Sequence, residues 1–184
     1  MTPTRILPDL QCSLLCEEVR QEANGNFFLV GVINFIRVPQ LPVVAYKLSV
    51  FNRWTAGIGQ FTECVRLIAP DQTTVLRKGE VKFALQDAAY HATNVTLFGQ
   101  VEFKTAGTYF LEVLVDDVMK LRYPVPVIVT PPADQTVPGG DPATFTVEAD
   151  SLAPVTYQWR YNGTDIPGAT GAEFRLFNAQ PPLQ

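Results

Sequence analysis

The stretch Thr105–Val129 constrains the fold more than any other part of the chain, because it predicts a long β-hairpin that closes a β-sandwich. Asp116-Asp117 supplies a polar turn, and Leu121–Val129 returns as the second strand. Side chains in a strand repeat every second residue. One face of the first strand is therefore predicted to carry Tyr109, Leu111, Val113 and Val115.

The returning strand contains two prolines, Pro124 and Pro126. Proline has no backbone N–H, and residues two apart in a strand direct their N–H groups to the same side. That side cannot be fully hydrogen-bonded to a neighbour, so the pattern predicts an edge strand. An edge strand can accept another strand, which makes Pro124 and Pro126 candidate interaction residues.

Turn signals recur about every ten residues before this hairpin, and they separate predicted strands. Gln86–Ala92 stays open as a helical turn or a crossover, and no amphipathic helix of useful length is present. The sequence therefore predicts an all-β fold, with an antiparallel β-sandwich over its first part. The main predicted strands are Leu10–Arg20, Asn26–Val38, Val43–Trp54, Gln60–Ala69, Glu80–Leu85 and Asn94–Lys104.

Three of these strands carry expectations about burial. Phe27–Phe35 is apolar on both faces, and such a strand usually lies in the middle of a domain. Trp54 is expected in the core, and an exposed aromatic patch with Tyr46 and Phe51 is the alternative. In Asn94–Lys104 the apolar side chains that alternate are Val95, Leu97, Val101 and Phe103.

The proline pair in Thr130–Asp134 predicts a boundary between a sandwich domain at 1–130 and a second domain at 131–184. The second part closely resembles the immunoglobulin-like domains of bacterial surface and repeat proteins. The residues that carry the resemblance are the Pro138-Gly139-Gly140 turn, the Phe145–Ala149 strand, Tyr157-Gln158-Trp159, the Asn162-Gly163 hairpin and Ile166–Ala169. The resemblance implies a β-sandwich and no particular ligand.

That family continues with a Gly-x-Tyr strand and its partner, whereas this sequence stops at Gln184. The immunoglobulin-like part is therefore expected to lack its last strands, which leaves the inner side chains Phe145 and Trp159 partly uncovered. Two explanations stay open: the sequence is truncated, or another chain donates the missing strands. Phe145 and Trp159 are accordingly candidate interaction residues.

The first part also resembles a known family. Its Leu14–Arg20, Asn24–Phe27, Val30-Gly31-Val32 and Arg53-Trp54 segments are similar to a family of small uncharacterised bacterial β-sandwich proteins over roughly residues 8–130. Membership of that family implies a fold and no activity.

The composition limits the classes of partner that the protein is expected to bind. A net charge of −4 and a pI near 5.0 argue against nucleic acid and anionic membranes. No apolar segment approaches the roughly 18 residues of a membrane-spanning helix. The N-terminus lacks the pattern of a signal peptide, which predicts a cytoplasmic protein, with an extracellular or particle-associated one as the alternative.

The sequence predicts no catalytic residue, no cofactor and no metal site. Cys12, Cys16 and Cys64 are expected to be buried free thiols, and His91 is the only histidine. We therefore expect a non-enzymatic structural or protein-interaction module that binds a protein partner or itself. Two alternatives stay open: a decoration or tail component of a virion-like particle, and a small metal-dependent or Cys/His-dependent hydrolase built on Cys16, Cys64 and His91.

Overall fold

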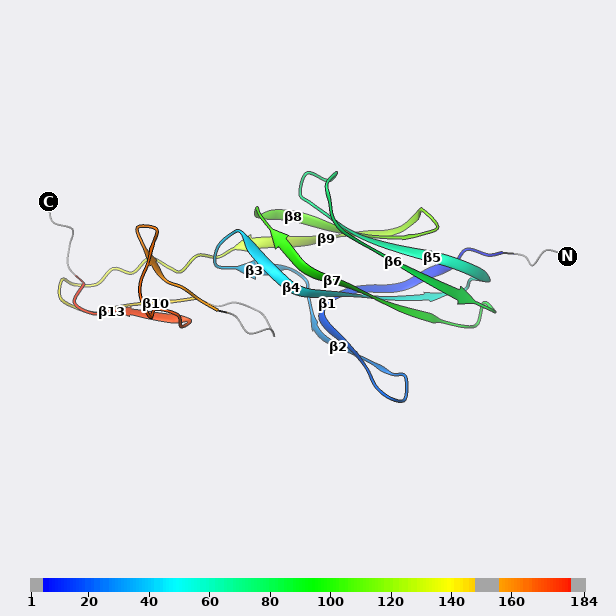
Figure 1. Cartoon of the computed structure of the whole chain (residues 1–184), viewed down its shortest axis with the longest axis horizontal. Helices are drawn as coiled ribbons and strands as arrows, with labels where there is room; N and C mark the ends of the chain where they lie inside the picture. Colours follow the sequence, from blue (N-terminus) through cyan, green and yellow to red (C-terminus); the bar gives the residue numbers. More distant parts are fainter. Residues whose placement is uncertain (1–4, 148–155, 180–184) are drawn as a thin grey trace. The chain divides into compact units, whose positions relative to one another are not determined.

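A computed structural model describes residues 5–147 and 156–179, and the regular structure in these ranges is entirely β-strand (Figure 1). The prediction of an all-β fold is confirmed. The chain divides into two compact units. The first comprises Met1–Ile36 and Leu41–Ile128, and the second comprises Arg37–Gln40 and Val129–Gln184.

Two sheets account for nearly all of the first unit, one with the strand order β2-β1-β4-β7 and one with the order β3-β9-β8-β5-β6, in which most of β3 belongs to the second unit. The pairings within β2-β1-β4-β7 and within β9-β8-β5-β6 are antiparallel. The strands are β1 (Asp9–Gln21), β2 (Phe27–Val32), β3 (Ile36–Val38), β4 (Val43–Thr55), β5 (Gly59–Ile68), β6 (Val75–Leu85), β7 (Ala92–Phe103), β8 (Gly107–Val115) and β9 (Val118–Val129).

The core lies between these sheets, as the hairpin pattern predicts. Every second residue of β8, from Tyr109 to Val115, is at most 2% exposed. Trp54 is fully buried and stacks on Phe83 with 5.6 Å between the ring centroids. Trp54 is therefore a core residue, and the alternative of an exposed patch around it is wrong.

The turn that joins β8 to β9 lies at Asp116-Asp117, as the sequence predicts. Asp116 and Asp117 have φ angles of 45° and 64°. Two residues with positive φ are the mark of the tight turn that matches the twist of antiparallel strands. The carboxylate of Asp116 adds a hydrogen bond of 2.9 Å from the backbone N–H of Thr62.

The prediction of one continuous central strand over Asn26–Val38 is wrong. The chain leaves the four-stranded sheet after β2 and enters the other sheet as β3. Gly31 adopts a φ of 61°, and a Cβ atom there would lie 2.9 Å from the side chain of Glu17, so only glycine fits without strain. As a result β2 is an edge strand rather than a central one.

The passage of the chain from one sheet to the other after β2 also corrects the expectation that Pro124 and Pro126 lie on an edge strand. Because β3 pairs with β9, the strand that contains Pro124 and Pro126 is not the outermost strand of its sheet. The proline pattern identified a strand near the edge, but it could not show that three residues from a distant segment lie beyond it. Pro124 is exposed and Pro126 is half-buried.

Burial in β7 also differs from the expectation. In its first half, Asn94, Thr96 and Phe98 face the core, and Leu97 is 60% exposed. Gln100 has a φ of 50°, which reverses the alternation, so that Val101 and Phe103 are buried as predicted. The apolar pattern therefore identified the inner face of only half of this strand.

The second unit contains two small antiparallel pairs: β10 (Ala143–Thr146) with β13 (Glu173–Leu176), and β11 (Arg160–Tyr161) with β12 (Thr164–Asp165). Asn162 and Gly163, both at positive φ, form the predicted hairpin turn. Trp159 packs against the ring of Phe174, with a centroid distance of 5.8 Å. The end of the predicted strand Phe145–Ala149 lies outside the described residues.

Candidate functional site

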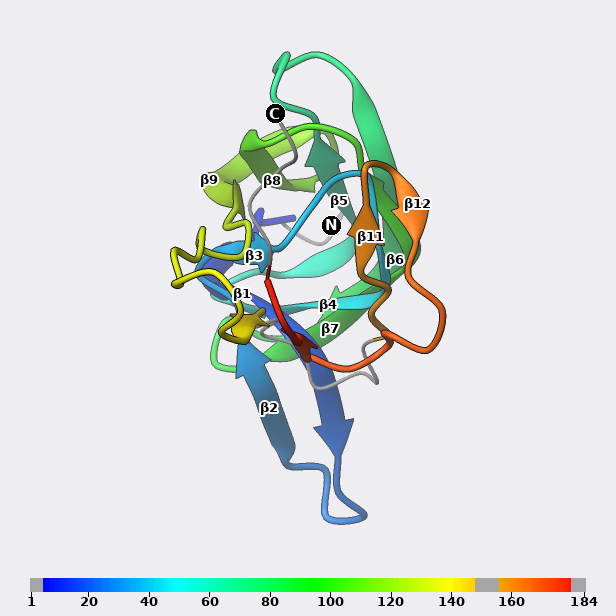
Figure 2. The same ribbon diagram turned by 90° about the vertical axis from the view of Figure 1, so that its left-hand side faces the viewer.

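Among the edge strands that the structure describes, β2 is the one that offers a long open side. The edge strands β6 and β7 contact each other, and the guanidinium of Arg77 donates to the backbone carbonyls of Gly99 and Gln100 across this junction. The edge strand β3 has three residues. In contrast, β2 has six residues and follows β1 into a hairpin that projects from the sandwich (Figure 2).

The backbone of β2 presents hydrogen-bonding groups outward. The N–H of Glu22 donates to the carbonyl of Asn26 at 2.9 Å, which defines a hydrogen-bonded pair at the end of the hairpin. Hydrogen-bonded and non-hydrogen-bonded pairs alternate along an antiparallel ladder. With this register, the backbone groups of Phe27 and Leu29 point away from β1.

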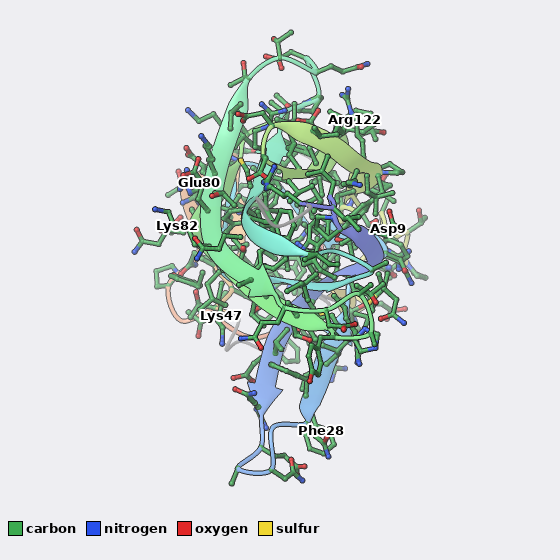
Figure 3. The ribbon with its side chains drawn as sticks, turned by 90° about the vertical axis from the view of Figure 1, so that its right-hand side faces the viewer. Asp9, Phe28, Lys47, Glu80, Lys82 and Arg122 are labelled. Carbon is green, nitrogen blue, oxygen red and sulfur yellow. The ribbon has the colours of Figure 1, made fainter. Side chains whose placement is uncertain are left out.

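Apolar side chains lie exposed along the same segment. Phe28 is 55% exposed and Val32 is 47% exposed. Phe28 lies on the projecting hairpin, away from the main body of the sandwich (Figure 3). Large exposed apolar side chains beside unpaired backbone groups are the features to which an additional strand binds.

The charges near this edge are mainly acidic. Between residues 9 and 32 the sequence has four acidic side chains and one basic, a net charge of −3. Glu18 forms ion pairs with Arg20 at 2.7 Å and with Lys47 at 3.4 Å. The hydrogen bond from Arg20, followed by that from Lys47, lowers the pKa of Glu18, so this carboxylate stays charged.

A second notable cluster is polar and lies in the core. Glu63 of β5 is fully buried, and one oxygen of its carboxylate accepts hydrogen bonds from Trp54 Nε1 and, at 3.0 Å, from Asn94 Nδ2. Asn52 and Thr96 lie nearby in the opposing sheet and are at most 5% exposed. Sequence reasoning missed this cluster, although Asn94 and Thr96 occupy alternate positions of β7.

The residues of the hydrolase alternative are spread over the first unit. Cys16 is buried on β1, Cys64 is buried on β5 in the other sheet, and His91 is exposed before β7. Burial raises the pKa of both thiols, which disfavours the reactive thiolate. Cys12 is only half-buried, contrary to expectation, and all three cysteines are free.

Neither metal nor membrane features are found in the described part of the chain. It contains no group of three or more His, Cys, Asp or Glu side chains arranged to hold a metal ion. None of its segments forms a helix long and apolar enough to cross a membrane. A surface depression of 480 Å³ lies over the β5–β6 ladder, but Asp116, one of its lining residues, is already bonded to Arg5 and Thr62.

The candidate interaction residues of the second unit, Phe145 and Trp159, are half-buried. Their rings lie 6.2 Å apart between centroids, and Trp159 Nε1 donates to the carbonyl of Gly171 at 2.9 Å. The structure brings these two together with Phe174. Pro124 and Pro126 belong to the other unit, where they are part of β9.

Comparison with known proteins identifies the first part of the chain. A family of unknown function (DUF6941) matches residues 11–128. The chain belongs to this family. The predicted resemblance of the first part to an uncharacterised family is thereby confirmed, and the DUF6941 match spans β1 through most of β9. A search of curated proteins found no match.

Proposed function

We propose that the DUF6941 sandwich is a non-catalytic protein-interaction module that binds an extended segment of a partner protein along the open edge of β2. The observation that carries the proposal is the coincidence of outward backbone groups at Phe27 and Leu29 with exposed apolar side chains at Phe28 and Val32. Main-chain hydrogen bonds would provide affinity, and the apolar side chains would select the partner.

The net charge of the β1–β2 hairpin indicates which kind of partner strand would bind. Two copies that paired through β2 would bring together two segments of net charge −3. Like charges repel across an interface, whereas a basic partner is attracted. The proposed occupant is therefore an apolar strand that carries Lys or Arg, rather than a second copy of the chain.

We further propose that the second unit is an immunoglobulin-like module that the first unit accompanies. The aromatic cluster of Phe145, Trp159 and Phe174 supports this assignment, because it joins the β10–β13 pair to the segment that precedes β11. The two-residue Asn162-Gly163 hairpin also supports it. The assignment specifies a fold and no ligand.

A capture experiment with variants of the full chain tests the interaction. Wild-type protein, Phe28→Lys and Tyr161→Lys are immobilised and exposed to a lysate of the source organism. Tyr161 is 72% exposed in the second unit, so its variant is a matched control. We expect a partner that binds the wild type and Tyr161→Lys but not Phe28→Lys, with weaker binding at high salt.

The purified partner is then added to the full chain, and hydrogen exchange is followed amide by amide. Slower exchange at Phe27 and Leu29 is expected, because their N–H groups would become bonded to the partner. A partner that binds Phe28→Lys as well as wild type and protects other amides would contradict the proposal. Protection that rises with the concentration of the chain itself would indicate self-association instead.

A further inference from the structure

The core of the first unit contains polar atoms without a hydrogen-bond partner. They belong to Glu63 (Oε1), Asn52 (Oδ1 and Nδ2) and Thr96 (Oγ1). Glu63 and Asn52 are fully buried, and Thr96 is 5% exposed. A buried polar group without a partner is rare in native proteins, because it forfeits the hydrogen bonds that it makes with water when the chain is unfolded.

The strand register places these groups around one residue, Asn94. Asn52 lies directly opposite Asn94 on β4, and directly opposed residues have Cβ atoms about 5 Å apart. Thr96 is the next residue of β7 on the same face, and Glu63 accepts a hydrogen bond from Asn94 across the core. The unpartnered atoms therefore belong to side chains on the inner faces of β4, β7 and β5, next to the Glu63–Asn94 hydrogen bond.

The chemistry of these atoms identifies what would satisfy them. Glu63 Oε1 and Asn52 Oδ1 are acceptors, and Asn52 Nδ2 is a donor only. A metal ion would bind the oxygens but could not accept a hydrogen bond from the amide nitrogen. Water donates two hydrogen bonds and accepts two, so it can bond to both kinds of group.

We infer that ordered, enclosed water is bound between Glu63, Asn52 and Thr96, where it links β4 and β7 of one sheet to β5 of the other. The inference is independent of the proposed partner at β2. The water extends the connection that the carboxylate of Glu63 already makes between Trp54 and Asn94. The two sheets of this sandwich are therefore joined by polar contacts as well as by apolar packing.

The substitution Thr96→Val tests the inference, because stability is expected to fall if the hydroxyl binds water and not to fall if it does not. Valine has nearly the shape of threonine but no hydroxyl. If the hydroxyl binds water, its removal breaks a hydrogen bond and lowers the folding equilibrium constant of the full chain about tenfold. If the hydroxyl is unpartnered, its removal leaves stability unchanged or increases it, and either result would overturn the inference.

Thr93→Val is the matched control, since Thr93 lies on the same strand and is only partly buried. Its equilibrium constant is expected to stay within about twofold of the wild type. A high-resolution crystal structure of the wild-type chain provides a second test that does not depend on the variant. It should show water within hydrogen-bond distance of Glu63 Oε1 and Asn52. A metal ion there, or a dry contact between Glu63 and Asn52, would refute the inference.

Discussion

The four-stranded sheet differs markedly between its β4–β7 side and its free edge at β2. On the first side, strands β4 and β7 direct Asn52, Asn94 and Thr96 into the core, where Glu63 of the other sheet accepts a hydrogen bond from Asn94. At the edge, β2 exposes apolar side chains, with Phe28 55% exposed. Polar groups are buried in one region of this sheet, and apolar groups are exposed in the other.

The difference shows that hydrophobicity alone does not assign the faces of these strands. A polar side chain is stable in the core when its hydrogen bonds are satisfied there. An apolar side chain remains exposed when its strand has no neighbour on that side, as at β2. We propose that the buried polar groups contribute to folding and that the exposed apolar groups bind a partner. The two proposals can be tested separately.

The largest expected effect is on stability, and it distinguishes two phenylalanines of the four-stranded sheet, Phe98 and Phe28. Phe98 on β7 is 3% exposed, so Phe98→Ala should reduce the free energy of unfolding by about 3–5 kcal/mol. Phe28→Ala should change it by less than about 0.5 kcal/mol, because more than half of that side chain is exposed. Urea denaturation of both variants measures the difference. Equal losses would show that the β2 side chain is also part of the core.

Removing the buried carboxylate of Glu63 should have the next largest effect on stability. Glu63→Leu leaves Trp54 Nε1 and Asn94 Nδ2 without an acceptor and should destabilise the chain by about 2–4 kcal/mol. Glu63→Gln retains an acceptor oxygen and is the matched control, with a smaller expected loss. If the leucine variant were as stable as the wild type, the polar connection between the sheets would not contribute to folding.

The stability of the chain at alkaline pH tests the contribution of another polar group, the hydroxyl of Tyr123. Burial raises the pKa of Tyr123 to about 12, and its hydroxyl accepts a hydrogen bond of 3.4 Å from Ser13. Between about pH 10 and pH 12 the folded chain holds a proton that the unfolded chain releases, so stability falls as the pH rises through this window, by about 2 kcal/mol. The decrease should be smaller in Tyr123→Phe; an identical pH profile would assign it to other groups.

A smaller effect is expected at the base of the free edge. Gly31→Ala forces a side chain into a φ of 61° and against Glu17, so we expect a loss of about 1–2 kcal/mol and faster exchange of the β2 amides. Gly99→Ala is the control, because the nearest atom to its added Cβ would be 3.9 Å away. If the two variants lost the same stability, the requirement for glycine at position 31 would be disproved.

Much of the fold could be predicted from local patterns. The β8–β9 hairpin, its Asp116-Asp117 turn and the buried Trp54 follow from alternation and turn chemistry, which depend on neighbouring residues. The position of β3 beyond β9 could not be predicted, because it depends on pairing between distant segments. The reversal at Gln100 was also missed, because glutamine rarely adopts a positive φ.

The candidate site was harder to predict than the fold. The apolar run at Phe27–Phe35 was read as a central strand, since composition does not show whether a strand has neighbours on both sides. The buried cluster was missed because Val95 and Leu97 suggested the opposite face of β7. Only the register with β4 shows that Asn94 faces Asn52 in the core.

Hydrogen exchange in the isolated full chain, measured amide by amide by NMR, tests the open edge of β2 most directly. The account predicts that the amides of Phe27 and Leu29 exchange rapidly, whereas those of Phe28 and Val30, which point toward β1, exchange slowly. Slow exchange at all four residues would mean that the edge is already covered, and the proposed binding surface would then not exist.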